Sequence, residues 1–205
     1  MSEPIYALAV AARGETRVRG SRFIATAIPV TEEERARAAV DSAEAASPDA
    51  THHCWAMRLA TPRGPVERGH DAGEPAGTAG IPILQAIRGE DLFDLVVVVA
   101  RYFGGTKLGK GGLARAYREA ARGVLRRSPR RRIEPRAILR IAVPIGRDGQ
   151  VRHLLARHGG LIERASYPGG GRANLIVGVP AAAVAALSEE IEALTRGEAE
   201  IGQIG

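Results

Sequence analysis

The sequence contains one cysteine, two lysines and no long apolar run. The lone Cys54 excludes a disulfide bond within the chain and is typical of a reducing compartment. Nowhere do about eighteen apolar residues follow one another, so we expect no membrane span. The first thirty residues lack the pattern of a secretory signal peptide. These absences lead us to expect a cytoplasmic protein without a membrane partner.

The positive charge is concentrated in one segment. The 205 residues carry a net charge of +6, with −4 in residues 1–100, +11 in 101–140 and −1 in 141–205. Dense positive charge attracts polyanions because binding releases their counterions, so this distribution favours RNA or the ribosome as a partner. The alternative is that the arginines form an ordinary solvated face.

Apolar patterning predicts a first domain over residues 1–128 that mixes strands and helices. Strands are expected at 5–12, 22–30, 52–60 and 95–103. Helices are expected at 31–46, 82–88 and 112–127. A capping box at Thr31 opens the first helix. The first two strands are expected to be joined by a charged loop, and 61–81 is expected to be a loop rich in glycine, proline and acids.

A second domain is expected over residues 137–205. Residues 129–136, with Pro129 and three consecutive arginines, are predicted to form a linker. Beyond it, strands are expected at 137–145, 160–167, 173–179 and 198–204, and helices at 148–158 and 181–196. The order β-α-β-β-α-β is that of a ferredoxin-like domain, so the fold class is α+β with two domains.

The predicted helix at 112–127 has two contrasting faces. One stripe holds Leu113, Tyr117, Ala120 and Val124, and the opposite stripe holds Arg115, Arg118, Arg122 and Arg126. The apolar stripe is expected to pack against the core, and the arginines to face solvent.

The segment RYFGGTKLGKGGLARAY (101–117) leads into this helix. Five glycines and both lysines lie between Gly104 and Gly112. The spacing from Gly104 to Lys110 is that of an NTPase phosphate-binding loop, but Gly111 stands where such a loop needs serine or threonine for magnesium. Glycines also let backbone N–H groups approach an anion at a helix N-terminus, so an anion site without hydrolysis is expected. Alternatively, the glycines only permit a left-handed backbone.

Eight cations are expected to contact phosphate groups: Arg22, Arg101, Lys107, Lys110, Arg115, Arg118, Arg122 and Arg126. Few exposed aromatic residues are expected, so base stacking is not predicted. Binding is expected to depend on shape and charge more than on base sequence.

A second hypothesis is an enzyme or small-ligand binder with a cleft beside the glycine loop. Asp71 and Glu74 would act as acid and base or bind a metal, and the ligand would be a nucleotide or a phosphorylated metabolite. The cleft would be lined by His53, Asp71, Glu74, Thr78, Gly104, Gly105, Gly109 and Gly112. Alternatively, the two carboxylates pair with arginines or cap a short helix.

The cluster His52-His53-Cys54 raises the question of a zinc site or a thiol nucleophile. Adjacent residues of a strand point to opposite faces, and no second Cys/His pair lies at ligand spacing. We therefore predict no metal site, cofactor or catalytic residue, and we expect Cys54 to be a core residue.

RYFGGTKLGKGGLARAY resembles the signature of the YigZ/IMPACT family. Three further stretches resemble the family in the same order: RGSRFIA (19–25), DATHHCWAM (49–57) and GEPAGTAGIPIL (73–84). Gly20 departs from the lysine that the family often has at this position. The resemblance implies a first domain like the second domain of a small ribosomal protein and domain IV of elongation factor G. It implies a second domain like domain V of that factor.

The resemblance implies no established catalytic residue. The eukaryotic member regulates translation by binding a protein partner, and bacterial members are suspected of binding nucleic acid or acting near the ribosome. The leading hypothesis is therefore a non-enzymatic RNA- or ribosome-binding protein with a role in regulating translation. A protein-binding regulatory module is the third hypothesis, by analogy with the eukaryotic member.

Overall fold

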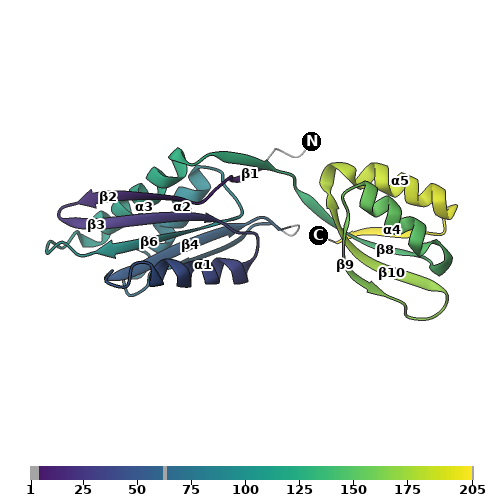
Figure 1. The fold of residues 1–205 in the computed structure, drawn as a ribbon, viewed down its shortest axis with the longest axis horizontal. Helices are drawn as coiled ribbons and strands as arrows, with labels where there is room; N and C mark the ends of the chain where they lie inside the picture. Colours follow the sequence, from purple (N-terminus) through teal and green to yellow (C-terminus); the bar gives the residue numbers. More distant parts are fainter. Residues whose placement is uncertain (1–4, 62–63, 205) are drawn as a thin grey trace. The chain divides into compact units, whose positions relative to one another are not determined.

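The computed structural model describes residues 5–61 and 64–204, which divide after Ile133 into two compact units. Both units combine helices with antiparallel sheets, which confirms the α+β fold class (Figure 1). The division falls at the end of the short strand β7 (Arg130–Ile133).

The N-terminal unit is built on a five-stranded antiparallel sheet of order β2-β3-β6-β4-β5. The strands are β2 (Ala12–Val18), β3 (Ser21–Pro29), β4 (His52–Leu59), β5 (Val66–His70) and β6 (Leu95–Tyr102). The central strand β6 is buried along almost its whole length, which explains its continuous run of valines. The prediction of a central strand at 95–103 is confirmed.

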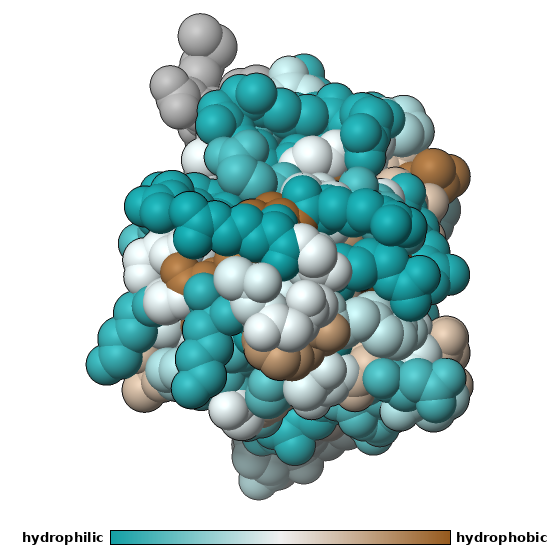
Figure 2. All heavy atoms as spheres, turned by 90° about the vertical axis from the view of Figure 1, so that its left-hand side faces the viewer, coloured by the Kyte–Doolittle hydropathy of each residue, from teal (hydrophilic) through white to brown (hydrophobic). Residues whose placement is uncertain are grey.

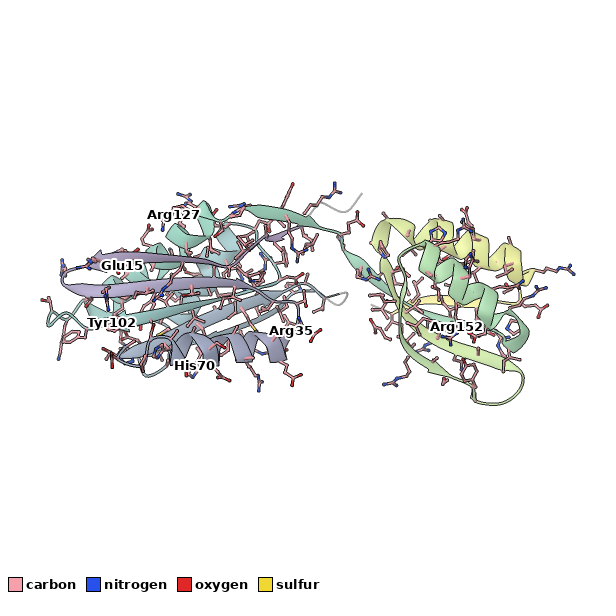
Figure 3. The ribbon with its side chains drawn as sticks, viewed as in Figure 1. Glu15, Arg35, His70, Tyr102, Arg127 and Arg152 are labelled. Carbon is pink, nitrogen blue, oxygen red and sulfur yellow. The ribbon has the colours of Figure 1, made fainter. Side chains whose placement is uncertain are left out.

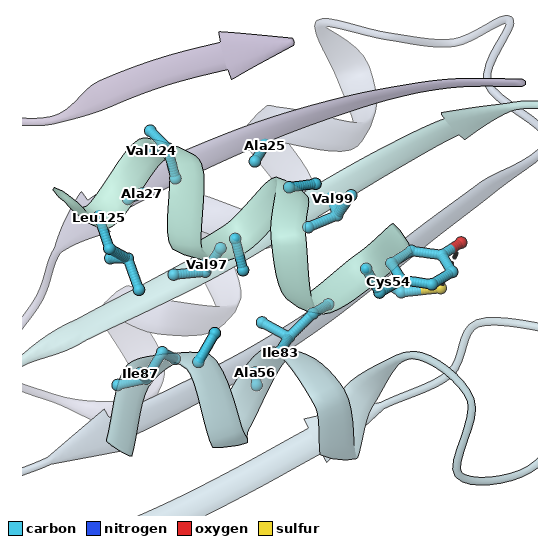
Figure 4. Packing of buried hydrophobic residues seen from close by; sticks show 14 of the residues in the cluster. Ala25, Ala27, Cys54, Ala56, Ile83, Ile87, Val97, Val99, Val124 and Leu125 are labelled. Atoms are coloured by element: carbon cyan, nitrogen blue, oxygen red, sulfur yellow. Dashed lines mark hydrogen bonds between the residues drawn. The ribbon is translucent and has the colours of Figure 1, made fainter. Parts of the chain in front are cut away.

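Helices cover both faces of this sheet. Helix α1 (Glu33–Ala45) packs on one face, and α2 (Gly80–Gly89) and α3 (Gly109–Arg127) pack on the other. Val97 and Val99 of β6 contribute to the core under α2 and α3, which Figure 4 shows from close by. Val96 and Val98 contribute to the core under α1. Alternate valines of the run therefore pack against different helix layers, because successive side chains of a strand point to opposite faces of the sheet.

Several segments of this unit differ from the sequence-based expectation. Strands β2 and β5 form where loops were predicted. Both are edge strands with charged outward positions, so their apolar alternation is weak. Residues 130–133, within the predicted linker, form β7 and pair with β1 (Ile5–Leu8). Helix α1 has Glu32 rather than Thr31 at its N-cap and makes no side-chain cap bond, so the predicted capping box is wrong.

The C-terminal unit is a four-stranded antiparallel sheet of order β11-β8-β10-β9. Its elements are β8 (Arg136–Pro144), α4 (Asp148–Arg157), β9 (Leu161–Ser166), β10 (Arg172–Pro180), α5 (Val184–Thr195) and β11 (Glu200–Ile204). Alternate residues of β8 and β10, such as Leu139 and Leu175, share one core with both helices. This strand order and connectivity confirm the ferredoxin-like arrangement.

Candidate nucleic-acid interface

Helix α3 separates its apolar and basic residues as the sequence predicts. The predicted apolar stripe of Leu113, Tyr117, Ala120 and Val124 is buried against the sheet. Arg115, Arg118 and Arg126 are exposed, and Arg122 is half-buried. The helix carries six basic side chains and a single acidic one, Glu119.

The loop between β6 and α3 is held at its start by close backbone packing. A Cβ atom on Gly104 would overlap the backbone of Gly20, in the turn between β2 and β3. The Gly104 N–H donates to Ser21 Oγ over 3.1 Å, and the Phe103 N–H donates to Thr51 Oγ1 over 3.2 Å. Gly104 is therefore required for packing and is not placed to approach an anion.

The second half of this loop is open. Gly105 and Gly109 have positive φ angles of 85° and 69°, and a Cβ atom at either position would meet nothing within 4 Å. Lys107 and Lys110 are exposed, and the first turn of α3 contains no acidic residue. Within residues 5–61 and 64–204, neither lysine nor Arg115 forms an ion pair. Figure 2 looks at this end of the N-terminal unit, where hydrophilic side chains surround a pale central area.

Further along α3, three arginines share one carboxylate. Glu90, just after α2, accepts from Arg126 Nε at 2.9 Å, from Arg130 Nη2 at 2.8 Å and from Arg122 Nε at 3.5 Å. Desolvation opposes ionisation of Glu90, but the three guanidinium groups prevail and lower its pKa. One carboxylate therefore neutralises only part of the charge of three arginines, and this cluster keeps an excess of positive charge. Arg118 bonds only the neutral side chain of Gln85 among the described residues, so its charge is not compensated there.

Arg101 does not belong to this surface, contrary to the prediction. Its side chain is buried, and its Nη1 lies 2.5 Å from Oε1 of Glu74. The hydroxyl of Tyr117 donates to the same oxygen over 2.8 Å. The prediction failed because the partner carboxylate lies 27 residues away in sequence, on a loop that folds over this end of β6.

Arg22 also lies elsewhere. Phe23 packs in the core under α3, so the neighbouring Arg22 points to the opposite face of the sheet. Its guanidinium carbon lies 4.1 Å from the ring centroid of Tyr102, which Figure 3 labels. Of the eight predicted phosphate-binding cations, five lie on α3 and a sixth, Lys107, lies in the loop before it: Lys107, Lys110, Arg115, Arg118, Arg122 and Arg126.

The acidic loop does not form the predicted catalytic cleft. The Asp71 carboxylate accepts backbone N–H bonds from Gly77, Ala79 and Gly80 at 2.8–2.9 Å. Desolvation alone would raise the pKa of Asp71, but the three backbone hydrogen bonds outweigh it, so the pKa of Asp71 is lowered. Asp71 therefore caps the start of α2 and folds the loop. Glu74 is buried in its ion pair, and Thr78 is buried with its hydroxyl bonded to the carbonyl of Pro75.

The histidine and cysteine side chains of β4 diverge as predicted. His53 Nε2 bonds the carbonyl of Ser47 at 2.9 Å, whereas Cys54 lies in the core under α3. His53 therefore does not join the acidic loop. Burial raises the pKa of the Cys54 thiol to about 12, so the thiol is protonated at neutral pH. In the part of the chain that the structure describes, no three His, Cys, Asp or Glu side chains are grouped as a metal site.

The comparison with known proteins places this geometry in a family. The family described as Impact N-terminal domain matches residues 19–125. The IMPACT family member YigZ of Escherichia coli is 34% identical over 185 residues, which cover 90% of each chain. This chain belongs to the IMPACT family.

Another relative and one solved structure are also similar to this chain. An IMPACT family member of Thermus thermophilus is 44% identical over 142 residues, covering 69% of the present IMPACT protein and 75% of its relative. The crystal structure of a hypothetical protein superposes with a TM-score of 0.82 at 32% identity, covering 100% of this chain and 99% of that one. The match at residues 19–125 includes the glycine loop and most of α3 but ends before Arg126 and Arg130.

Sequence reasoning missed three features of this IMPACT protein. The meeting of Arg130 with Glu90 depends on where β7 lies, which the sequence pattern did not reveal. Phe103 is 48% exposed, although few exposed aromatics were expected. A cavity of about 420 Å³ between α1, β4 and β5 is lined in part by Trp55 and His70.

No helix among residues 5–61 and 64–204 is long and apolar enough to cross a membrane.

Proposed function

We propose that this IMPACT protein binds RNA, free or within the ribosome, through the exposed side of α3 and the loop before it. The observation that supports this most is the composition of α3, with six basic side chains against one acidic residue. A phosphate polymer matches such a row because each contact releases counterions. At 1.5 Å per residue, the 19 residues of α3 span about 28 Å, enough for several phosphates.

The proposed RNA-binding surface, formed by α3, the loop before it and Arg130, has two parts that would contact the RNA differently. Lys107, Lys110 and Arg115 have no carboxylate partner within the described ranges, so they can contact phosphates without losing an ion pair. The Glu90 cluster of Arg122, Arg126 and Arg130 is held in place and retains an excess of positive charge. Binding through backbone phosphates would carry little base specificity, which suits a general role in translation in the cytoplasm.

Paired substitutions test the proposal. We expect Arg115→Ala/Arg118→Ala to weaken binding of a fluorescent RNA and to lower the slope of log affinity against log salt by about 1–2. The matched control is Arg35→Ala/Arg37→Ala, because these exposed arginines belong to α1 on the opposite face of the same sheet. Figure 3 labels Arg35 on that helix. Equal effects of both double substitutions, or no binding by the unaltered protein, would contradict the proposal.

Ribosome association is a separate readout. If the proposed surface acts in translation, the unaltered protein should sediment with ribosomes or subunits at low salt. The Arg115→Ala/Arg118→Ala protein should shift to the free fractions, while the α1 control should not. Sedimentation that survives nuclease treatment and high salt would instead point to a protein partner.

A further inference from the structure

Phe103 presents an apolar ring to solvent from a fixed backbone. The residue as a whole is 48% exposed, although its N–H is bonded to Thr51 and the next residue is packed against Gly20. Single exposed apolar side chains are common and by themselves carry no functional meaning. Here the backbone on both sides of the ring is held, so the exposure is built into the fold.

The Phe103 ring lies close to one buried charged group. The guanidinium carbon of Arg101 lies 5.5 Å from the ring centroid, and Arg101 is itself buried. The ring therefore lies near a buried guanidinium group, while close to half of the residue stays open to solvent. The neighbouring Tyr102 differs, because the guanidinium group of Arg22 already covers its ring at 4.1 Å.

The surroundings of Phe103 select for a particular ligand chemistry. Lys107 follows four residues later and Lys110 three residues after that, both exposed and without carboxylate partners in the described chain. An apolar surface of a partner protein would cover the ring but leave these lysines without a match. A nucleotide matches both, because its base has a flat face and its phosphate is an anion.

We infer that Phe103 stacks on an unpaired base, so that the RNA is single-stranded where it meets the glycine loop. This inference rests on the proposed RNA-binding function and adds the form of RNA recognised. In a duplex the base faces are covered by their neighbours, and an aromatic side chain gains access only to unstacked bases. The cations of α3 would then hold the flanking backbone.

The test uses the full chain and one labelled 12-nucleotide RNA of mixed sequence, measured by fluorescence anisotropy. The probe is used alone, paired with its complement, and with abasic residues in place of its bases. We expect Phe103→Ala to weaken binding of the single strand about 5- to 100-fold. Binding of the duplex and the abasic strand should be unchanged, and so should the salt slope, since no charge is lost. Phe103→Trp should retain single-strand binding.

The control is Tyr167→Ala, which removes a ring of similar exposure (52%) from the C-terminal unit. Far-ultraviolet circular dichroism checks that each variant is folded. If Phe103→Ala leaves single-strand binding unchanged, or weakens all three probes equally, the stacking inference is wrong while RNA binding stands. If the unaltered protein binds none of the probes at low salt, the proposed function fails and the inference fails with it.

Discussion

Glu74 and Arg101 form a buried ion pair, with 2.5 Å between Oε1 and Nη1. The pair joins the loop before α2 to the end of β6, and the Tyr117 hydroxyl adds α3 to the same carboxylate. Three segments that surround the glycine loop are therefore fixed to one oxygen atom. The residues that first suggested catalysis instead hold the framework on which the proposed RNA-binding surface rests.

Removal of one partner of this pair should destabilise the N-terminal unit strongly. Glu74→Ala leaves the guanidinium group of Arg101 buried without a counter-charge, so the free energy of unfolding should fall by about 3–5 kcal/mol. The double variant Glu74→Leu/Arg101→Met should lose less, because no unpaired charge remains. Urea unfolding of the full chain measures both, and a double variant less stable than Glu74→Ala would argue against this reading.

Gly104 should not tolerate a side chain. In Gly104→Ala the new methyl group overlaps the Gly20 backbone, and the shift needed to make room should cost about 1–3 kcal/mol. Gly123→Ala is the control, since it lies in α3 and a Cβ there meets nothing within 4 Å. That change should stabilise the protein by up to about 1 kcal/mol. Thermal unfolding that shows the same sign for both changes would contradict the packing role of Gly104.

Asp71 should make stability depend on pH. Its folded-state pKa is lowered, so its contribution is present above the unfolded pKa of about 3.9 and is lost as the pH falls through the folded value. Asn has one acceptor oxygen where Asp71 uses two, so Asp71→Asn should cost about 1 kcal/mol near neutral pH, and the difference from the unaltered protein should shrink in acid. Asp49→Asn, at an exposed turn, is the matched control for the same chemical change. A difference that stays constant with pH would rule out this role.

Glu90 should restrain RNA binding. In Glu90→Gln the guanidinium groups of Arg122, Arg126 and Arg130 lose their shared counter-charge and become available to phosphates. Affinity for RNA should increase, and the salt slope should steepen by about 0.7–0.9 for each additional phosphate contacted. Glu189→Gln, an equal charge change on α5 of the C-terminal unit, should have less effect. Weaker RNA binding by Glu90→Gln would contradict this prediction and would show that RNA affinity depends more on the fixed positions of the three arginines than on their net charge.

The sequence was most informative for helices and strands whose own residue pattern is enough to identify them. The valine run of β6 and the apolar stripe of α3 follow from periodicity alone, and both are found as predicted. The β-α-β-β-α-β order of the second unit is likewise readable from alternating segments. Edge strands β2 and β5 were missed because charged outward residues weaken the pattern by which strands are recognised.

The candidate RNA-binding surface was less predictable, because which arginines belong to it depends on carboxylates that are distant in the sequence. Arg101 and Arg115 are both arginines of one basic segment, but only Arg101 meets a carboxylate, Glu74, that the fold brings from another loop. Arg22 was separated from α3 by the alternation of side chains along β3, which becomes clear only once the covered face is known. Charge density identified the segment, and tertiary pairing decided which of its cations are free.

The pairing of β1 with β7 has a consequence for synthesis of the chain. Residues 5–8 are synthesised before their antiparallel partner, which is completed only at Ile133. While the intervening segment emerges, the backbone groups of β1 that β7 will bond lack that partner. The β1–β7 pair of the N-terminal unit can therefore form only once the chain has been synthesised up to the boundary with the C-terminal unit.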